Sequence, residues 1–221
     1  MDEGVNTVFD CADPASRAAG IDAAASALRS GRLVVMPTDT VYGLGCDAFD
    51  GDAVSSLLRA KGRGRDMPVP VLVGSWSTID GLVYSVSDQA RSLIRAFWPG
   101  GLSLVVRQAP SLGWDLGDAH GTVMLRMPLH PVAVELLRTV GPMAVSSANI
   151  SGRPPSTTMA DAKAQLGSAV EVFLDGGHCE HGVPSTIVDV SGAAPRILRE
   201  GAVTAESVAD VVGVSAEDLR S

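Results

Sequence analysis

The chain has 221 residues and a formal net charge of −8, and 46% of its residues are hydrophobic. This balance indicates a folded domain and excludes a disordered chain, while the excess of acidic groups disfavours an extended nucleic-acid surface. The acidic N-terminus has no apolar signal segment, and no apolar stretch reaches the ~20 residues of a membrane span. Three cysteines without paired spacing favour reduced thiols, so we expect a cytoplasmic protein with no membrane partner.

The first quarter of the chain predicts two helices around one strand. Asp13-Pro14 begins a helix that continues through the alanine-rich residues 15–29. Apolar residues 32–36 then predict a buried strand. A Thr- and Gly-rich segment, residues 38–49, is expected to be a loop. Residues 52–60 predict a second helix, because their apolar side chains share one face.

The rest of the chain alternates the same two patterns. Helical periodicity predicts helices over residues 87–97, 131–140, 159–166 and 204–212. Short apolar runs predict strands over residues 69–73, 102–107, 123–127, 143–146, 170–174, 186–190 and 196–198. Helices between strands favour an α/β sheet, but the short spacing between the last two strands requires an antiparallel pair. We expect a twisted mixed parallel and antiparallel sheet with flanking helices in one domain, residues 1–213, followed by a frayed tail, residues 214–221.

A basic segment, Lys61-Gly62-Arg63-Gly64-Arg65, places three cations within five residues of an acidic chain. Cations that alternate with glycines lie on backbone that can approach a ligand closely, which suits the phosphates of a nucleoside triphosphate. The alternative is an exposed last helical turn, whose cations favour the helix dipole. The glycines favour the phosphate interpretation, because a solubilising turn does not need them.

Three further segments place small polar groups where predicted strands begin or end. Residues 37–45 (PTDTVYGLG) follow a strand, and two threonines flank Asp39 there. Residues 146–149 (SSAN) supply short neutral donors and acceptors after another strand. Ser185 and Arg199 would lie at one sheet edge if the last two strands form a hairpin. Each segment could instead be a turn whose side chains bond their own backbone.

The segment His178-Cys179-Glu180-His181 has residue types that bind metals. Its adjacent positions lack the separated spacing of common zinc sites, so an ordinary loop is the better interpretation and we expect no metal held by protein side chains. The chain also has no GxSxG elbow, HExxH helix or Walker loop. A covalent nucleophile is therefore not expected.

Six stretches, taken in order, resemble the YrdC-like family of threonylcarbamoyl-AMP synthases: GRLVVMPTDTVYGLGCDAFD, KGR followed by MPVPVLV, FWPGGLSLVV, VMLRMPLHPVA, AVSSANISGRP, and VPSTIVDVS with PRILREG. They span residues 31–201. The resemblance implies a YrdC-like fold with an open basic cavity. It also implies that L-threonine, bicarbonate and ATP, with Mg²⁺, give threonylcarbamoyl-AMP and pyrophosphate. A tRNA-modifying threonylcarbamoyl transferase complex would accept this product, with weak or no direct nucleic-acid binding by this chain.

The resemblance also implies two groups of site residues. Those expected to bind threonine are Thr38, Arg126, Val145 and Ser185. Those expected to bind ATP are Lys61, Arg63, Arg65, Thr122, Ser147, Asn149 and Arg199. Lys61 and Arg63 are the candidate catalytic residues, since their charges would stabilise the leaving pyrophosphate. Arg65 has the weakest basis, because the family has no firm basic character there. Arg126 also stands out by itself, since an arginine in an apolar strand needs an anionic partner or must reach solvent.

The chain departs from the family pattern at two glycines. Gly64 stands where a proline is usual, and Gly101 replaces the second proline of WPGP, so both changes are expected to loosen the backbone. Nothing after Gly201 is long enough for the additional domain of two-domain relatives, so we expect the single-domain form. A double-stranded RNA, tRNA-binding or ribosome-maturation module without catalysis is the alternative function. A carbamoyl-transfer domain of hydrogenase maturation proteins is a third, but their zinc-finger and acylphosphatase regions are not found here.

Overall fold

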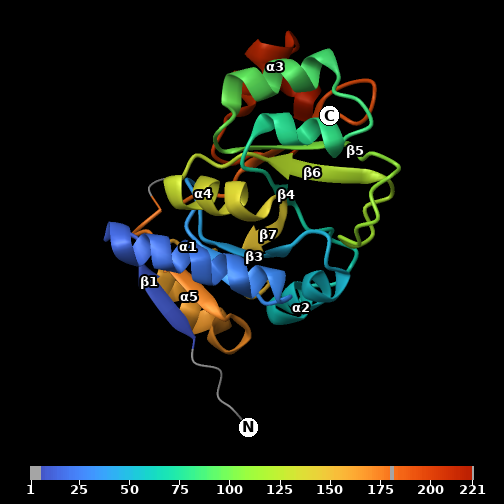
Figure 1. The fold of residues 1–221 in the computed structure, drawn as a ribbon. Coiled ribbons are helices and arrows are strands. Elements are labelled where there is room, and N and C mark those ends of the chain that lie inside the picture. The colour runs from blue at the N-terminus through green and yellow to red at the C-terminus, as the bar shows by residue number, and fades with distance from the viewer. Residues whose placement is uncertain (1–5, 180–181, 221) are drawn as a thin grey trace.

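The computed structural model describes residues 6–179 and 182–220, which form a ten-stranded sheet with helices against both faces (Figure 1). The strand order is β1-β8-β2-β3-β7-β4-β6-β5-β9-β10. The strands are β1 (Thr7–Asp10), β2 (Val34–Met36), β3 (Gly43–Asp47), β4 (Val71–Leu72), β5 (Leu102–Arg107), β6 (Thr122–Arg126), β7 (Met143–Ser147), β8 (Val172–Asp175), β9 (Thr186–Asp189) and β10 (Arg196–Arg199). The helices are α1 (Pro14–Arg29), α2 (Gly51–Lys61), α3 (Asp88–Phe97), α4 (Pro131–Val140), α5 (Met159–Leu166), α6 (Ala205–Val212) and α7 (Ala216–Arg220), with 3₁₀ turns at Trp76–Gly81 and Gly167–Ala169.

The expected mixed sheet is confirmed. Strands β5 and β9 run parallel, as do β1 and β8, whereas β3 is antiparallel to both β2 and β7. The hairpin expected at the end of the chain is present, because β9 and β10 pair antiparallel. All six predicted helices are found within one residue of their expected bounds, and the eight predicted strands within two residues.

Two layers of apolar side chains hold the helices to the sheet. Helices α1 and α4 cover one face, where Leu28 and Leu136 belong to one cluster with Val34 and Leu174. A second cluster includes side chains of α2, α3, α5, α6 and α7 and other buried apolar side chains of the sheet, such as Val35 and Leu125. Each fully buried Leu stabilises the fold by about 1.5–3 kcal/mol, so these layers fix where the strand ends lie.

The expected loop over residues 38–49 is wrong for its second half. Residues Gly43–Asp47 form β3 in the middle of the sheet, between β2 and β7. Leu44 and Cys46 are fully buried, while a Cβ on Gly43 would lie 2.7 Å from the side chain of Val145, and one on Gly45 2.7 Å from that of Met143. The glycines weaken the apolar signal of a strand, but here they leave room for side chains of the next strand.

The expected frayed tail is also wrong for residues 216–220, which form α7. Ser215 accepts a hydrogen bond from the backbone N–H of Asp218 (3.1 Å), which caps this helix. Leu219 is fully buried, and Arg220 forms ion pairs with Glu200 (3.0 Å) and Glu206 (3.1 Å). The burial of Leu219 therefore holds this otherwise polar segment against the domain.

Two further observations concern the helices and the cysteines. None of the described helices is long and apolar enough to cross a bilayer. Cys11, Cys46 and Cys179 are all buried and free of disulfide bonds, as the cysteine count suggested.

Candidate active site

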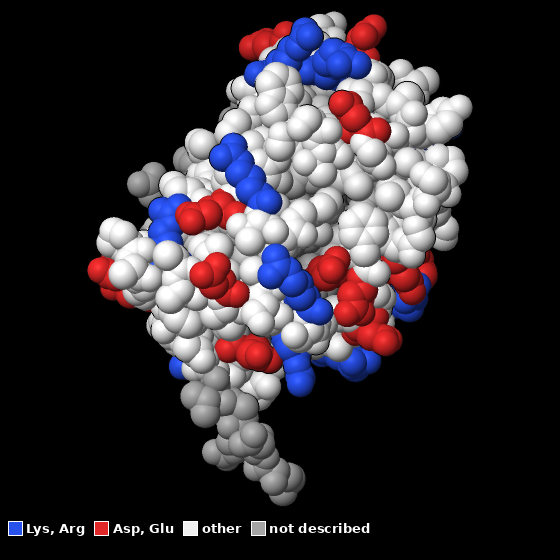
Figure 2. Space-filling view, in the orientation of Figure 1, with Lys and Arg blue, Asp and Glu red and all other residues white. Residues whose placement is uncertain are grey.

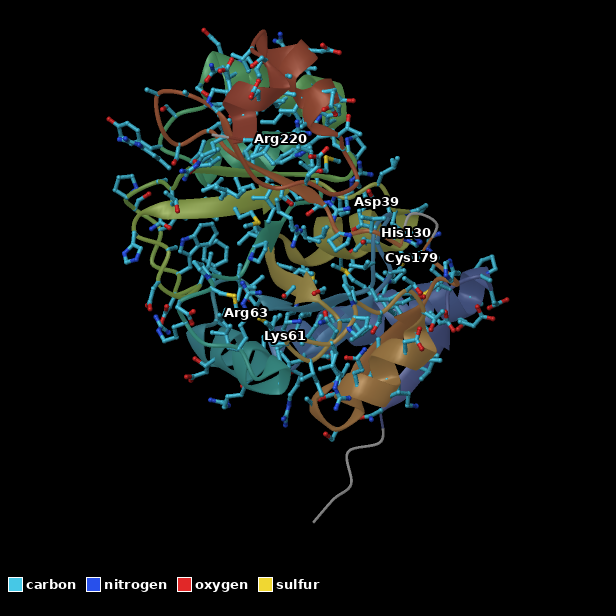
Figure 3. All side chains as sticks on the ribbon, turned by 180° about the vertical axis from the view of Figure 1, so that it is seen from behind. Asp39, Lys61, Arg63, His130, Cys179 and Arg220 are labelled. Atoms are coloured by element: carbon cyan, nitrogen blue, oxygen red, sulfur yellow. The ribbon has the colours of Figure 1, made fainter. Side chains whose placement is uncertain are left out.

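A cavity of about 210 Å³ opens where polar strand ends meet, and most of the predicted site residues line it. These are Thr38, Arg63, Arg126, Val145, Ser147, Ser185 and Arg199. Three of them are arginines, and no Asp or Glu occurs among the described residues that line the cavity. Figure 3 shows Lys61 and Arg63 beside the end of α2, with Asp39, His130 and Cys179 in a second group apart from them. The cavity is therefore suited to an anion.

Helix α2 positions Lys61, its last residue. Asp50 caps the start of the helix by accepting from the N–H groups of Asp52 and Ala53 (both 3.0 Å), and Gly62 ends it in a left-handed conformation (φ 60°). The side chain of Lys61 is 2% exposed and donates to the carbonyl oxygens of Ser147 and Asn149, the latter at 2.7 Å. Lys61 thus lies behind the cavity wall and holds the segment that follows β7.

The charge of Lys61 has no acidic partner among the described residues. Burial and the neighbouring charge of Arg63 lower the pKa of Lys61 to about 8. In mildly alkaline solution, and with no ligand bound, part of the Lys61 side chains are therefore in the neutral amine form. An anionic ligand nearby would favour the charged form.

This pKa predicts how ATP affinity depends on pH. ATP should bind better to protonated Lys61, so above pH 8 the dissociation constant of MgATP should rise, approaching about tenfold per pH unit. Isothermal titration calorimetry across this range measures it. Lys61→Gln, which carries no charge at any pH, should bind MgATP more weakly and show no inflection near pH 8. A wild-type dissociation constant that does not change with pH would contradict the prediction that Lys61 binds ATP.

Arg63 reaches the cavity from the loop after α2. One terminal nitrogen donates to Ser146 Oγ (3.1 Å) and the other to the carbonyl oxygen of Pro68 (3.0 Å). Its Nε is buried without a hydrogen-bond partner among the described residues. Burial lowers the pKa of Arg63, Asp66 opposes this, and the charge of Arg199 lowers it further. Two arginines that repel each other, and a buried donor without an acceptor among the described residues, both make this part of the cavity suited to an anionic group.

Arg126, at the end of β6, has the anionic partner that its position requires. It forms a buried ion pair with Asp39 (2.7 Å), and both side chains are less than a tenth exposed. Arg126 also donates to Thr40 Oγ1 (2.9 Å) and to the carbonyl oxygen of Gly100 (2.8 Å). Of the five N–H groups of an arginine, these bonds leave one on each terminal nitrogen for a ligand. Asp39 and Thr40 were not among the predicted site residues, although both lie in the motif that was singled out.

Ser185 and Arg199 meet across the β9–β10 hairpin, as the hairpin hypothesis predicted. Arg199 donates to the carbonyl oxygen of Ser185 from Nη2 (2.7 Å) and Nε (3.1 Å), and Nη2 also lies 3.3 Å from Ser185 Oγ. Gly201 allows this approach, because a Cβ there would lie 2.1 Å from the carbonyl oxygen of Pro184. The conformation of the hairpin end thus determines where Arg199 lies.

A methyl group at position 201 should therefore disturb the site. Gly201→Ala is expected to lower the free energy of unfolding by about 1–3 kcal/mol and to weaken MgATP binding, because the overlap must move Arg199 or Ser185. Gly192→Ala is the matched control in the same hairpin, since a Cβ there meets nothing within 4 Å. Chemical denaturation and calorimetry of both variants measure the two effects. Equal behaviour of the two variants would contradict this role of Gly201.

The remaining predicted residues lie in different surroundings. Asn149 donates to the carbonyl oxygens of Ile150 (2.9 Å) and Arg153 (2.8 Å), and its buried Oδ1 has no partner among the described residues. Thr122 does not line the cavity; its hydroxyl donates to the carbonyl oxygen of Ala119 (2.7 Å). Because it is four residues before Arg126 on β6, it shares that residue's face of the sheet.

The structure does not bring Arg65 to the cavity. Its guanidinium donates to both carboxylate oxygens of Asp115 (2.7 and 3.1 Å), lies 3.5 Å from Asp118, and is half exposed. That Arg65 binds the nucleotide stays a prediction, and this pairing makes it the weakest of the predicted nucleotide contacts. An acidic loop fifty residues away satisfies its charge, and nothing in the local sequence indicates that pairing.

Gly101 has a packing role, which differs from the expected loosening of the backbone. A Cβ at this position would lie 2.6 Å from the Cβ of Ala202. Gly101 also accepts a hydrogen bond from the N–H of Thr186 (2.9 Å). A larger residue would thus separate β5 from the end of the hairpin that carries Arg199.

Residues that could bind a metal are few near this cavity. The described residues contain no group of three or more His, Cys, Asp or Glu side chains that could hold a metal ion. Of the segment 178–181, Glu180 and His181 lie outside the described residues. No Asp or Glu is found among the described residues that line the cavity.

A family model named Sua5/YciO/YrdC and described as "Telomere recombination" matches residues 26–201. The chain belongs to the Sua5/YciO/YrdC family. A Mycobacterium tuberculosis H37Rv protein, provisionally named a threonylcarbamoyl-AMP synthase, is 69% identical over 96% of this chain and 97% of its own length. The threonylcarbamoyl-AMP synthase of Pyrococcus abyssi is 36% identical over 86% of this chain. This chain spans only 56% of that archaeal protein.

Solved structures of the Sua5/YciO/YrdC family have the same fold. P. abyssi Sua5 in complex with L-threonine superimposes with a TM-score of 0.88 at 33% identity over 94% of this chain, which spans 61% of Sua5. Escherichia coli YciO superimposes with a TM-score of 0.81 over 92% of this chain, but at 22% identity it supports the fold alone.

Proposed function

We propose that this chain is a threonylcarbamoyl-AMP synthase, which converts L-threonine, bicarbonate and ATP to threonylcarbamoyl-AMP and pyrophosphate. The observation that carries the proposal is the cavity, where three arginines meet and no described acidic side chain lines the wall. The 69% identity to a mycobacterial protein of that provisional name supports it. So does the similarity to a Sua5 that binds L-threonine.

The two sides of the cavity suit the two substrates. Arg126 has N–H groups left for the carboxylate of threonine, beside the hydroxyls of Thr38 and Ser185. On the other side, Arg63 and Arg199 would contact the phosphates of ATP, and Lys61 would add its charge from behind the wall. Asn149 Oδ1 and Ser147 are available to the rest of the nucleotide. Mg²⁺ would enter as part of the substrate MgATP.

The chemistry requires positioning and neutralisation of charge more than a nucleophilic side chain. The amine of threonine adds to CO₂ derived from bicarbonate and loses a proton, which gives a carbamate. A carbamate oxygen then bonds to the α-phosphorus of ATP while the bond from that phosphorus to the bridging oxygen breaks and pyrophosphate leaves. Negative charge grows on the leaving group, where Arg63 and Arg199 would stabilise it. No protein base is assigned.

The proposal extends to the setting of the reaction. A threonylcarbamoyl transferase complex would consume the adenylate and modify adenosine in tRNA. The cytoplasm, where ATP and tRNA occur together, is the proposed compartment. On the face drawn in Figure 2, basic and acidic side chains are interspersed, which does not favour a broad nucleic-acid surface on that side.

A pyrophosphate-release assay tests the proposed activity. Purified protein with MgATP and isotopically labelled bicarbonate should release pyrophosphate only when L-threonine is present, and the label should appear in an adenylate detected by mass spectrometry. Absence of threonine-dependent pyrophosphate would overturn the synthase. Binding of tRNA with steep salt dependence and without ATP binding would instead support the RNA-binding alternative.

A further inference from the structure

Ser103 is a buried polar residue in the interior of an apolar strand. Its neighbours Leu102 and Leu104 point into the hydrophobic core, so Ser103 points to the opposite face of β5 and lines the cavity. The side chain is 3% exposed. It belongs to the stretch FWPGGLSLVV, to which the proposed function assigns no ligand contact. A hydroxyl buried at such a place needs a hydrogen-bond partner.

That partner is Ser185, one of the residues proposed to bind threonine. The two hydroxyl oxygens lie 2.8 Å apart, and both side chains are buried. The parallel pairing of β5 with β9 fixes this distance, because Leu102 lies opposite Thr186. Ser103 lies within β5 and Ser185 directly precedes β9, so the pairing of these strands determines where both hydroxyls lie.

The protons available to the two hydroxyls, together with their exposure, give the direction of this bond. Arg199 can only donate, so its 3.3 Å contact takes one lone pair of Ser185 Oγ. If Ser103 donates as well, the second lone pair of Ser185 is used and the proton of Ser185 is free for the cavity. If Ser185 donates instead, the proton of Ser103 has no acceptor among the described residues. Each arrangement leaves one hydroxyl proton for the cavity. The first is favoured because Ser185 is the more exposed of the two, 8% against 3%, so its proton can reach a ligand or water in the cavity.

We propose that Ser103 is a positioning residue, which holds the hydroxyl of Ser185 so that its proton points into the cavity and is donated to an oxygen of threonine. This inference rests on the proposed function. Ser103 itself does not need to touch the substrate. Its effect should fall on threonine binding and leave the nucleotide contacts of Arg63 unchanged.

Two variants of nearly identical shape test the role of the hydroxyl. Ser103→Thr keeps the oxygen, whereas Ser103→Val replaces it with a methyl group, and both side chains suit a strand. Loss of one neutral hydrogen bond corresponds to about a tenfold effect or less. We therefore expect Ser103→Val to raise the KM for threonine about tenfold with little change in the KM for ATP, and Ser103→Thr to restore most of the affinity.

A double-mutant cycle distinguishes positioning from a purely structural role. In the Ser185→Ala background, Ser103→Val should have no further effect on the KM for threonine, because the hydroxyl that it orients is gone. Threonine-dependent pyrophosphate release by the wild type must be seen in the same assay, and its absence would overturn the proposed function itself. An active wild type with equal KM values for Ser103→Thr and Ser103→Val, or with additive effects in the cycle, would overturn the role of Ser103 alone.

Discussion

Replacement of Arg63 by alanine is expected to lower kcat/KM for ATP by about 10²–10³-fold, the usual effect of removing one preorganised charge from a developing anion. Arg63 lines the cavity, and its buried Nε has no partner among the described residues. The loss should appear in both kcat and KM, because the charge contacts phosphate before and during the reaction. Steady-state pyrophosphate release with varied ATP measures it.

Arg65 supplies the matched control two residues away. Arg65→Ala removes the same side chain from the same loop, but its charge is exposed and paired with Asp115 outside the cavity. Exposed ion pairs contribute little, so kcat/KM for ATP should fall less than about threefold. A larger loss for Arg65→Ala than for Arg63→Ala would reverse the assignment of these two arginines.

Asp39→Asn is expected to have the largest effect on stability. It leaves the buried guanidinium of Arg126 without its counter-charge, which costs about 3–5 kcal/mol in comparable buried pairs. For a chain of this size that corresponds to a fall in Tm of about 10 °C. Threonine binding should fall with it, since Asp39 holds the arginine that faces the substrate. Thermal denaturation and threonine titration measure the two effects.

Two comparisons make this second prediction specific. The exposed pair of Arg17 and Glu135 is the control, and Glu135→Gln should cost less than about 1 kcal/mol. Removing both buried charges, as Asp39→Asn with Arg126→Met, should recover much of the stability while threonine binding stays lost. If Asp39→Asn alone leaves Tm unchanged, the buried ion pair of Arg126 and Asp39 does not stabilise the fold in the way proposed.

Much of the fold could be predicted because its signals are local. Helix α2 has an acidic cap, one apolar face and a glycine at its end, and all three are visible in the sequence. The spacing after Asp189 is too short for a helix, which predicted the β9–β10 hairpin and the meeting of Ser185 with Arg199. The strand β3 was not predicted. Gly43 and Gly45 alternate with Leu44 and Cys46 there, and glycines weaken the apolar pattern that indicates a strand.

The site could be predicted only where a motif or a local rule carried the information. The need of Arg126 for an anion was visible, but its partner Asp39 lies 87 residues away in sequence. The resemblance gave Arg65 the weakest basis of the nucleotide residues, and only the fold shows that its charge is paired with Asp115. Ser103 gave a weak signal, a polar residue in an apolar strand, whose meaning depends on the strand beside it.

A crystal structure with L-threonine and a non-hydrolysable ATP analogue tests the account most directly. We predict that the carboxylate of threonine lies against Arg126 and Ser185, and that the phosphates lie between Arg63 and Arg199, with Arg65 still paired to Asp115. Either ligand bound at another surface, with these three cavity arginines free of contact, would contradict the account.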